Sequence, residues 1–473
     1  MPTLVLTPLI VATALFMENL DGTVLATALP AMAADLHEDP IALKLALTSY
    51  LLALAVFIPM SGWAADKFGA RKVFRAAIVV FTLGSILCGL SSSLETVVAS
   101  RVVQGMGGAM MAPVGRLVIL RTAPRAELVR ALAWLTIPAL IGPLIGPPVG
   151  GFIATYFHWR YIFWINVPMG ALGVLLTSRF IPDLRETDVS PLDIRGAALT
   201  GVGLSCLVFG FSVAGRGAVP PLAWTSLILI GFAALFAYVR YACNAPFPIL
   251  DLGLLKVPTF RAAVLGGFLF RIGIGALPFL LPLLFQAGFH LSAFQSGSLT
   301  FIAAAGAMAM KTAAQPILHA FGFRRVLIVN ALISSVFLTA NIFFTVETPH
   351  WIVMAVLLVG GFIRSLEFTA LNAVGYAEID QRILSRATSF ASVGQQLSQS
   401  VGVAIGAAAL EASRAMRGGG ELAASDFAPA FMVVALISAA SIFAFRPLAA
   451  NAGDELAGRN SRSDYGEVSV RSG

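Results

Sequence analysis

Seven charged side chains stand inside long apolar stretches of the chain, where a charge is costly and usually serves a function. They are Glu18, Asp21, Arg101, Arg271, Lys311, Arg364 and Glu367. A carboxylate in such surroundings can take up and release a proton, and a buried base can pair with an acid or a charged ligand. We therefore treat these seven residues as the candidates for the chemistry of this protein.

Two of the acids are close in sequence. Glu18 and Asp21 are three residues apart, so in a helix they lie about 60° apart around the axis and within reach of each other. Two neighbouring carboxylates in an apolar setting do not ionise independently, so we expect this pair to exchange protons as one coupled unit. The alternative is that Arg101, Arg271 or Arg364 permanently neutralises one of the two acids.

Other kinds of site are not indicated. The three cysteines are odd in number and show no motif spacing, so neither a disulfide framework nor a zinc site is expected. The five histidines lie in loops or at the ends of apolar stretches, and no metal site is predicted from them. The nearest approach to a phosphate-binding Walker motif, Lys311-Thr312, follows Met310 rather than Gly. We therefore expect no cofactor, no metal and no ATP site.

The composition is that of a membrane protein. Of the 473 residues, 58% are hydrophobic and 12% charged, against about 45–50% and about 25% in soluble domains. This excludes a soluble enzyme, a secreted disulfide-rich domain and a disordered regulator. The net charge of +7 does not indicate nucleic acid, because the basic residues recur in short loops rather than in one patch.

Fourteen apolar stretches reach the length of about 20 residues that a spanning helix needs, and they predict an all-α integral membrane protein. Their approximate bounds are 6–34, 45–62, 73–94, 96–120, 132–154, 159–181, 196–214, 222–243, 260–286, 294–318, 325–346, 351–376, 385–411 and 427–446. The first stretch is not expected to be a cleaved leader, because no Lys or Arg precedes it and two acids interrupt it. The polar residues 447–473 are expected to form a disordered cytoplasmic tail.

The distribution of basic residues predicts the orientation. With the N-terminus in the cytoplasm, 22 of the 31 Lys and Arg residues fall in inside loops and the tail, and five fall in outside loops. Positive charge accumulates on the cytoplasmic side of membrane proteins. We therefore expect both termini in the cytoplasm.

A short pattern recurs in two loops. Residues 68–73 read Phe-Gly-Ala-Arg-Lys-Val, and residues 321–326 read Phe-Gly-Phe-Arg-Arg-Val on the same predicted side. Two parallel six-helix halves would produce this repeat. We therefore predict an N-terminal six-helix bundle over 1–185, a two-helix insert over 186–250 and a C-terminal six-helix bundle over 251–446.

The loop after the second stretch has features of a structured turn. Gly69 permits a tight turn with positive φ, and Gly62 would let two helices approach closely. Asp66 can accept hydrogen bonds from a helix N-terminus or a basic neighbour. We expect a gating role for this loop, with the residues Gly62, Asp66, Lys67, Gly69, Arg71 and Lys72.

The fifth stretch carries glycine at every fourth position. Gly142, Gly146 and Gly150 form one smooth face for close helix packing. Pro143 and Pro147 remove backbone donors and bend the helix, and Gly151 follows directly. A closely packed, bendable helix suits a rocking interface between two halves.

Four motifs resemble the major facilitator superfamily and, within it, the fourteen-span drug:proton antiporters, over nearly the whole chain. They are the loop at 62–72, the run Arg101-Val-Val-Gln104-Gly105, the glycine pattern at 142–151, which is similar to the antiporter signature, and Leu20-Asp21-Gly22-Thr23 in the first stretch. The sequence departs from the usual pattern at Ala70, where a base is common, and at Ala26, where Asn is common.

The resemblance implies roles for the intramembrane charges. It places a central cavity between the first and fourth helices of each half, on which all the candidate charges except Lys311 fall. It ties Arg101 to proton transfer, with Asp21 as the essential acid and Glu18 as its neighbour. Glu18, Asp21, Arg271, Arg364 and Glu367 are then the candidate cavity residues, although Arg364 and Glu367 could pair with each other. Four polar residues of the thirteenth stretch, Gln395, Gln396, Ser398 and Gln399, are expected to bond neighbouring helices rather than form a site.

The expected function is proton-driven multidrug efflux. The protein would act as a monomer in the bacterial inner membrane and export small amphipathic compounds in exchange for protons, with no cofactor and no nucleic-acid partner. The alternative is a transporter of a specific metabolite, amino acid or sugar from the same superfamily. The glycine pattern at 142–151 favours export.

Overall fold

The computed structural model describes residues 2–122, 128–182, 185, 191–213, 220–246, 248–380 and 383–454, and in these ranges the chain forms helices and no strands. The N-terminal half comprises α1 (Pro2–Leu36), α2 (Lys44–Phe68), α3 (Ala70–Leu90), α4 (Leu94–Thr122), α5 (Leu128–Tyr156), α6 (Tyr161–Trp164) and α7 (Asn166–Phe180). Two further helices follow, α8 (Ile194–Val213) and α9 (Pro221–Ala242). The C-terminal half comprises α10 (Pro258–Leu283), α11 (Ala293–Phe321), α12 (Phe323–Ala340), α13 (His350–Val374), α14 (Leu384–Met416) and α15 (Phe427–Phe445), with short helices η2 (Leu252–Lys256), η3 (Leu284–Gly288), η4 (Asn341–Phe343) and η5 (Ala424–Asp426).

The helices account for all fourteen predicted spans. Within the described residues, twelve helical segments are long and apolar enough to cross a membrane, one of them made of α6 and α7 together. The other two predicted spans correspond to α5, with 29 residues, and α14, with 33. The prediction of an all-α multi-pass membrane protein is confirmed.

The sixth span is broken, which the sequence reading did not anticipate. The break between α6 and α7 lies at Ile165. Pro168 has no backbone N–H to donate to the carbonyl of Trp164, so the regular hydrogen-bond ladder is interrupted at this point.

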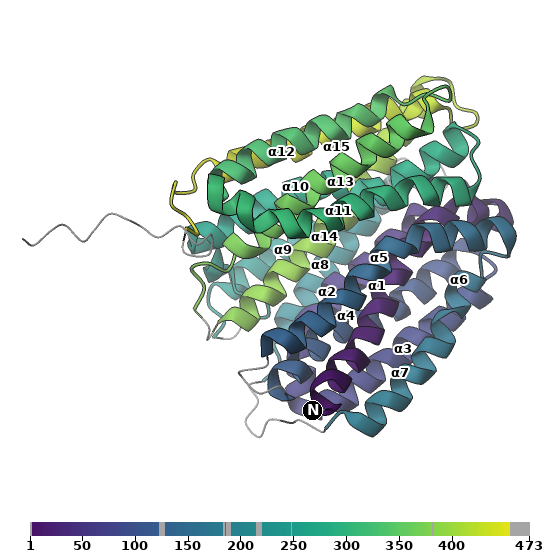
Figure 1. Ribbon diagram of the computed structural model, residues 1–473. Coiled ribbons are helices and arrows are strands. Elements are labelled where there is room, and N and C mark those ends of the chain that lie inside the picture. Colours follow the sequence, from purple (N-terminus) through teal and green to yellow (C-terminus); the bar gives the residue numbers. More distant parts are fainter. Residues whose placement is uncertain are drawn as a thin grey trace, which may run out of the picture.

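The two halves repeat the same helix pairings. In the N-terminal half, α1 packs on α5, α2 on α4, α3 on α4, and α3 on α7; in the C-terminal half, α10 packs on α14, α11 on α13, α12 on α13, and α12 on α15. The repeated turns also match, because Gly69 and Gly322 both have positive φ, at 95° and 74°. Figure 1 shows the purple-to-blue helices of the first half below the green-to-yellow helices of the second.

The insert packs against the junction of the halves. Helices α8 and α9 form a pair, and α8 lies against α2 and α14. Leu204 and Val208 of α8 share an apolar cluster with Leu52 of α2 and Val393 of α14. The insert therefore covers one flank of the seam between the two halves.

The end of the chain is packed further than expected. Leu448 and Ala452 belong to the predicted tail 447–473, but both are buried against the C-terminal helices. Residues 455–473 of the predicted tail lie outside the described residues.

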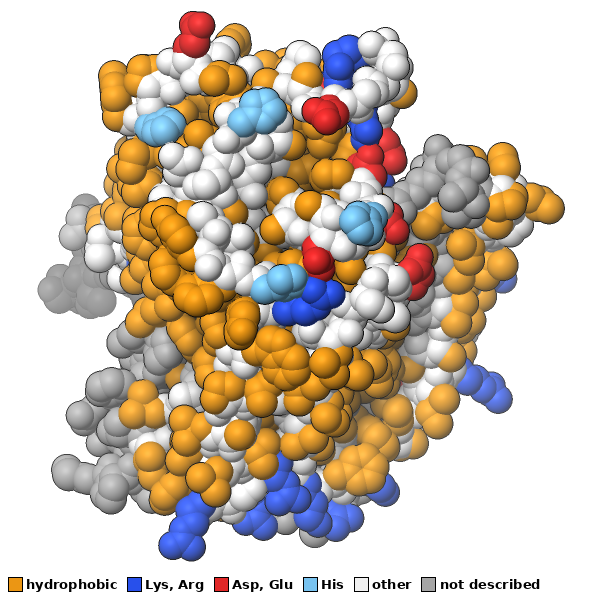
Figure 2. Space-filling model, turned by 90° about the vertical axis from the view of Figure 1, so that its right-hand side faces the viewer, with side chains coloured by type: hydrophobic (Ala, Val, Ile, Leu, Met, Phe, Trp, Pro, Cys, Tyr) orange, Lys and Arg blue, Asp and Glu red, His pale blue; other side chains and the backbone are white. Residues whose placement is uncertain are grey.

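The surface separates apolar and charged side chains. Figure 2 shows a broad band of hydrophobic side chains, with several Lys and Arg side chains along the lower edge. The visible Asp, Glu and His side chains lie in the upper half, together with a few more Lys and Arg side chains. We call the side that carries the N-terminus and the turns at Gly69 and Gly322 the inner side, and the opposite side the outer side.

Candidate functional site

A central cavity of about 610 Å³ lies between the two halves. Its wall is built from α1, α2, α4 and α5 on one side and from α10, α11, α13 and α14 on the other. Most of the lining is apolar, with cationic groups from Arg101, Lys311 and Arg364 and amide groups from Gln395 and Gln399. A cavity of this size and character is typical of a small-molecule site.

The two halves close over the outer end of this cavity. The side chain of Lys44, at the start of α2, forms an ion pair with Glu411 of α14 at 3.4 Å, and Asp39 forms another with Arg414. On the opposite flank, the ring of Phe152 on α5 contacts that of Phe294 on α11. The cavity is therefore sealed from the outer side in the conformation described.

The glycine pattern of α5 forms the close contact that the sequence predicted. A Cβ atom at Gly146 would overlap the side chain of Thr23, and one at Gly150 would overlap the carbonyl oxygen of Val24, both on α1. A Cβ atom at Gly142 would lie 3.1 Å from the backbone of Leu20. One face of α5 is thus pressed against the backbone of α1.

The other face of α5 reaches the C-terminal half. A Cβ atom at Gly151 would overlap the carbonyl oxygen of Ala293, and one at Gly297 of α11 would overlap that of Pro147. The two helices therefore meet through glycine from both sides, and α5 joins α1 directly to the opposite half. Pro143 and Pro147 both line the central cavity.

Asp21 and Arg101 form a buried ion pair. The Nη1 atom of Arg101 lies 2.5 Å from Oδ2 of Asp21, and the two residues are 0% and 2% exposed. Asn166 donates a hydrogen bond to Asp21 Oδ1 at 2.9 Å, and so does Gln104. Ser85 accepts hydrogen bonds from both of these amides. The acid is therefore held by α3, α4 and α7, behind the cavity wall.

Arg101 connects this cluster with the cavity. Its guanidinium donates to the carbonyl of Ala46 and to Gln104, and lies over the ring of Tyr50 at 4.1 Å. Arg101 and Tyr50 line the cavity, whereas Asp21 does not. Arg101 can therefore respond both to the charge on Asp21 and to a molecule in the cavity.

Glu18 is not paired with Asp21 in the described structure. Its Oε2 atom is buried without a hydrogen-bond partner among the described residues. Asp21 is instead neutralised by Arg101, which is the alternative that the sequence left open. Glu18 also lies outside the cavity lining.

The charges of the C-terminal half do not form the pair considered from the sequence. Glu367 accepts a hydrogen bond from Asn330 at 2.9 Å, and no ion pair joins it to Arg364 in the described part of the chain. Arg364 lines the central cavity, whereas Glu367 lies behind it and Arg271 lines a separate small pocket. Lys311, on α11, also lines the cavity and donates to Thr369 at 3.0 Å.

The loop between α2 and α3 is anchored to α4. Arg121 forms an ion pair with Asp66 at 2.8 Å, and Gly69 takes the positive φ that the sequence predicted. The predicted close approach at Gly62 is wrong, because a Cβ atom there would meet nothing within 4 Å. Lys67 and Lys72 are exposed on the inner side, and Arg71 is half-buried.

Several site residues were missed from the sequence. Ser85 and Asn166 are single polar residues in apolar helices, and nothing in their spacing links them to Asp21. Gln395 and Gln399 were expected to bond helices, but they line the cavity. A polar stripe on one helical face was the available signal for these two glutamines.

The comparisons with known proteins agree with this architecture. The sequence matches the Major Facilitator Superfamily over residues 11–264 and 263–463. This chain belongs to the Major Facilitator Superfamily. Among its relatives in the superfamily are proteins named multidrug resistance protein MdtD from Salmonella paratyphi A, 38% identical over 84% of each chain, and from Pectobacterium atrosepticum, 39% identical over 84% of this chain and 85% of that one.

Solved structures of the superfamily fold are also similar. The D-xylose–proton symporter matches 94% of this chain and 98% of its own with a TM-score of 0.68 at 14% identity. The human organic anion transporter MFSD10 matches the same shares with a TM-score of 0.58 at 15% identity. At this identity the likeness concerns the fold, which is the two-bundle architecture described above.

Proposed function

We propose that this superfamily member is a multidrug efflux transporter that exports small amphipathic compounds in exchange for protons. The observation that carries the proposal is that Arg101 lies between a central cavity and a buried acid, Asp21. The relatives named as multidrug resistance proteins support the substrate class. The glycine contacts between α5 and α11, at Gly151 and Gly297, support movement of one half against the other.

The coupling follows from competition for one guanidinium. While Asp21 is ionised, it holds Arg101 through the 2.5 Å ion pair. A proton on Asp21 removes that charge and frees Arg101 to change its contacts in the cavity wall. Proton binding and substrate binding therefore influence each other without direct contact, which is the linkage that exchange requires.

The conformation fits one stage of alternating access. Closed packing at the outer ends of α2, α5, α11 and α14 seals the cavity there, so substrate enters from the inner side. Reopening at the outer side then releases it, as the two repeated halves rock about the bound molecule. Glu18, Glu367, Arg271 and Arg364 are proposed to tune this cycle from around the cavity, and the loop from Gly62 to Lys72 to gate its inner end.

We place the protein in the bacterial inner membrane with both termini in the cytoplasm, acting as a monomer without a cofactor. The concentration of Lys and Arg in the loops on the side of the N-terminus supports this orientation. A proton moving through roughly 150 mV supplies about 3.5 kcal/mol, enough for about a 300-fold gradient of a neutral solute.

The test is efflux from proteoliposomes that contain the purified protein and no nucleotide. An imposed proton gradient should drive export of a neutral amphipathic dye, and a protonophore should stop it. Export that continues after the gradient is collapsed would contradict proton exchange. Competition by an unrelated amphipath, but not by sugars or amino acids, would separate multidrug export from transport of one metabolite.

A further inference from the structure

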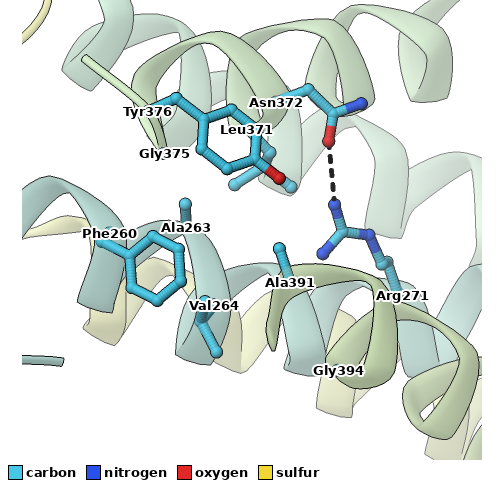
Figure 3. A pocket seen from close by; sticks show the side chains of 10 residues that line it. All are labelled: Phe260, Ala263, Val264, Arg271, Leu371, Asn372, Gly375, Tyr376, Ala391 and Gly394. Carbon is cyan, nitrogen blue, oxygen red and sulfur yellow. Dashed lines mark hydrogen bonds between the residues drawn. The ribbon is translucent and has the colours of Figure 1, made fainter. Parts of the chain in front are cut away.

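A second, much smaller pocket lies beside the central cavity in the C-terminal half. It has a volume of about 20 Å³ and is enclosed by α10, α13 and α14. Figure 3 shows Arg271, Asn372 and Tyr376 around it, with the apolar side chains of Phe260 and Val264 opposite. Asn372 lines both the small pocket and the central cavity, so the two are adjacent.

Among the described residues, no acid forms an ion pair with Arg271, the cation in this pocket. Arg271 is 6% exposed, and its Nε atom has no hydrogen-bond partner among the described residues. Its Nη2 atom donates to Asn372 at a long 3.4 Å, and its guanidinium lies 5.5 Å from the ring of Phe368. Glu367 acts on Arg271 electrostatically, but it forms no ion pair with it and accepts a hydrogen bond from Asn330. A buried guanidinium in this state is strongly stabilised by an anion.

The groups around Arg271 suit a carboxylate. The guanidinium is a planar fork of donors that matches two carboxylate oxygens. Tyr376 and Asn372 add a hydroxyl and an amide donor at the same pocket (Figure 3). A tyrosine phenol is protonated at neutral pH, so its hydroxyl is able to donate.

We propose that this pocket is an anion subsite, which takes the carboxylate of an exported amphipath whose apolar body occupies the central cavity. The volume limits the ligand, because about 10–15 Å³ holds one water molecule, so 20 Å³ accepts an end group and not a whole molecule. The proposal rests on the proposed export function and adds a substrate class to it.

The charge of the cavity wall is consistent with such a substrate. On the C-terminal side, Arg364 and Lys311 both line the cavity, and Lys311 donates to the neutral hydroxyl of Thr369. On the N-terminal side, Arg101 is already neutralised by Asp21. In the part of the chain that the structure describes, only the C-terminal side of the cavity therefore offers positive charge without an acidic partner. This orients the carboxylate of an anionic molecule toward α10 and α13.

The test compares two fluorescent probes that differ in charge. Dansylglycine carries a carboxylate and dansylamide does not, and binding of each to the purified full-length protein is followed by fluorescence. Arg271→Gln should weaken dansylglycine binding at least tenfold and change dansylamide binding less than twofold. Arg261→Gln, an exposed arginine on the same helix, should change neither. Unchanged dansylglycine binding to Arg271→Gln would overturn the subsite.

A milder variant covers the case in which Arg271→Gln does not fold. Tyr376→Phe removes one hydroxyl and should weaken dansylglycine binding severalfold while dansylamide binding stays the same. Dansylglycine binding as tight as in the natural protein would overturn the proposal. Gradient-driven export of dansylamide by the natural protein tests the export function separately, because dansylamide has no carboxylate for the subsite.

Competition by small anions identifies the kind of anion that the small pocket binds. If formate competes with dansylglycine in the natural protein and not in Arg271→Gln, the pocket binds a carboxylate. If chloride competes with dansylglycine and formate does not, the pocket binds a free inorganic anion. That result would overturn the substrate role. Competition by neither would show that no anion binds there.

Discussion

At the residue scale, the ion pair between Asp21 and Arg101 is the feature with the largest expected effect. Asp21→Asn leaves a fully buried guanidinium without its counter-ion, which typically costs about 3–5 kcal/mol. We expect a lower Tm and loss of proton-driven efflux. Thermal unfolding in detergent and efflux from proteoliposomes measure the two effects.

Two control variants separate coupling from folding. The double change Asp21→Asn with Arg101→Gln leaves no unpaired charge, so it should regain stability while remaining uncoupled. Glu18→Gln leaves the ion pair intact, so gradient-driven efflux should survive. If the stable double variant exchanges drug for protons at the natural rate, neither partner is the coupling group.

The glycines of the loop between α2 and α3 are expected to differ from each other. Gly69→Ala places a side chain at φ 95°, ψ 131°, a backbone conformation that costs about 1–3 kcal/mol. Gly62→Ala, in the helix before it, meets no atom within 4 Å and should stabilise the helix by about 0.5–1 kcal/mol. Thermal unfolding of the two variants measures this difference in stability. Equal stability of the two variants would contradict the turn assigned at Gly69.

These residues also show how far the sequence could be interpreted. The turn at Gly69 follows from local conformational preference, and the sequence predicts it correctly. The environment of Gly62 depends on where a neighbouring helix lies, and the pairing of Asp21 depends on how α1, α4 and α7 meet. Local patterns contain no such distances, so they left open whether Asp21 would face Glu18 or Arg101.

At the scale of the element, α5 packs on α1 and also on α11 of the opposite half, and we propose that the motion depends on this helix. Gly150→Ala would place a methyl group against the carbonyl oxygen of Val24, and backbone cannot move aside as a flexible side chain can. We expect a strong loss of transport with normal membrane insertion, and a further loss for Gly150→Leu. Gly62→Ala is the matched control, because the same change there meets open space. Normal efflux by both Gly150 variants would show that transport does not depend on the contact of this face of α5 with α1.

The helix boundaries show what sequence predicts well and poorly at this scale. Apolar length marks twelve helical segments of the described residues, because each span must cross the same thickness of hydrocarbon. The same criterion says little about α14, whose glutamines face the cavity and lower its hydropathy. It also gives no sign of the break at Ile165, where a single proline acts.

At the scale of the whole molecule, the outer ion pairs join the two halves. Lys44 is 1% exposed and pairs with Glu411, and Asp39 pairs with Arg414 one helical turn away. Because these pairs link α2 and its preceding loop to α14, they stabilise the conformation that is closed on the outer side. Opening to release substrate must break them, so their strength sets part of the balance between the two access states.

Charge reversal tests this balance. Glu411→Lys puts a second ammonium beside Lys44 and should shift the population toward outward opening, whereas the swap Lys44→Glu with Glu411→Lys should restore the closed state. Spin labels at His37 and Met416, both exposed at the outer ends, report the separation of the halves after Cys206 and Cys243 are replaced by Ser. A longer distance in the single variant and recovery in the swap are expected, together with slower efflux in the single variant alone. The same distance in all three proteins would mean that the outer ends are held by the packing of α5 on α11, and the charge pairs would then have no part in the gate.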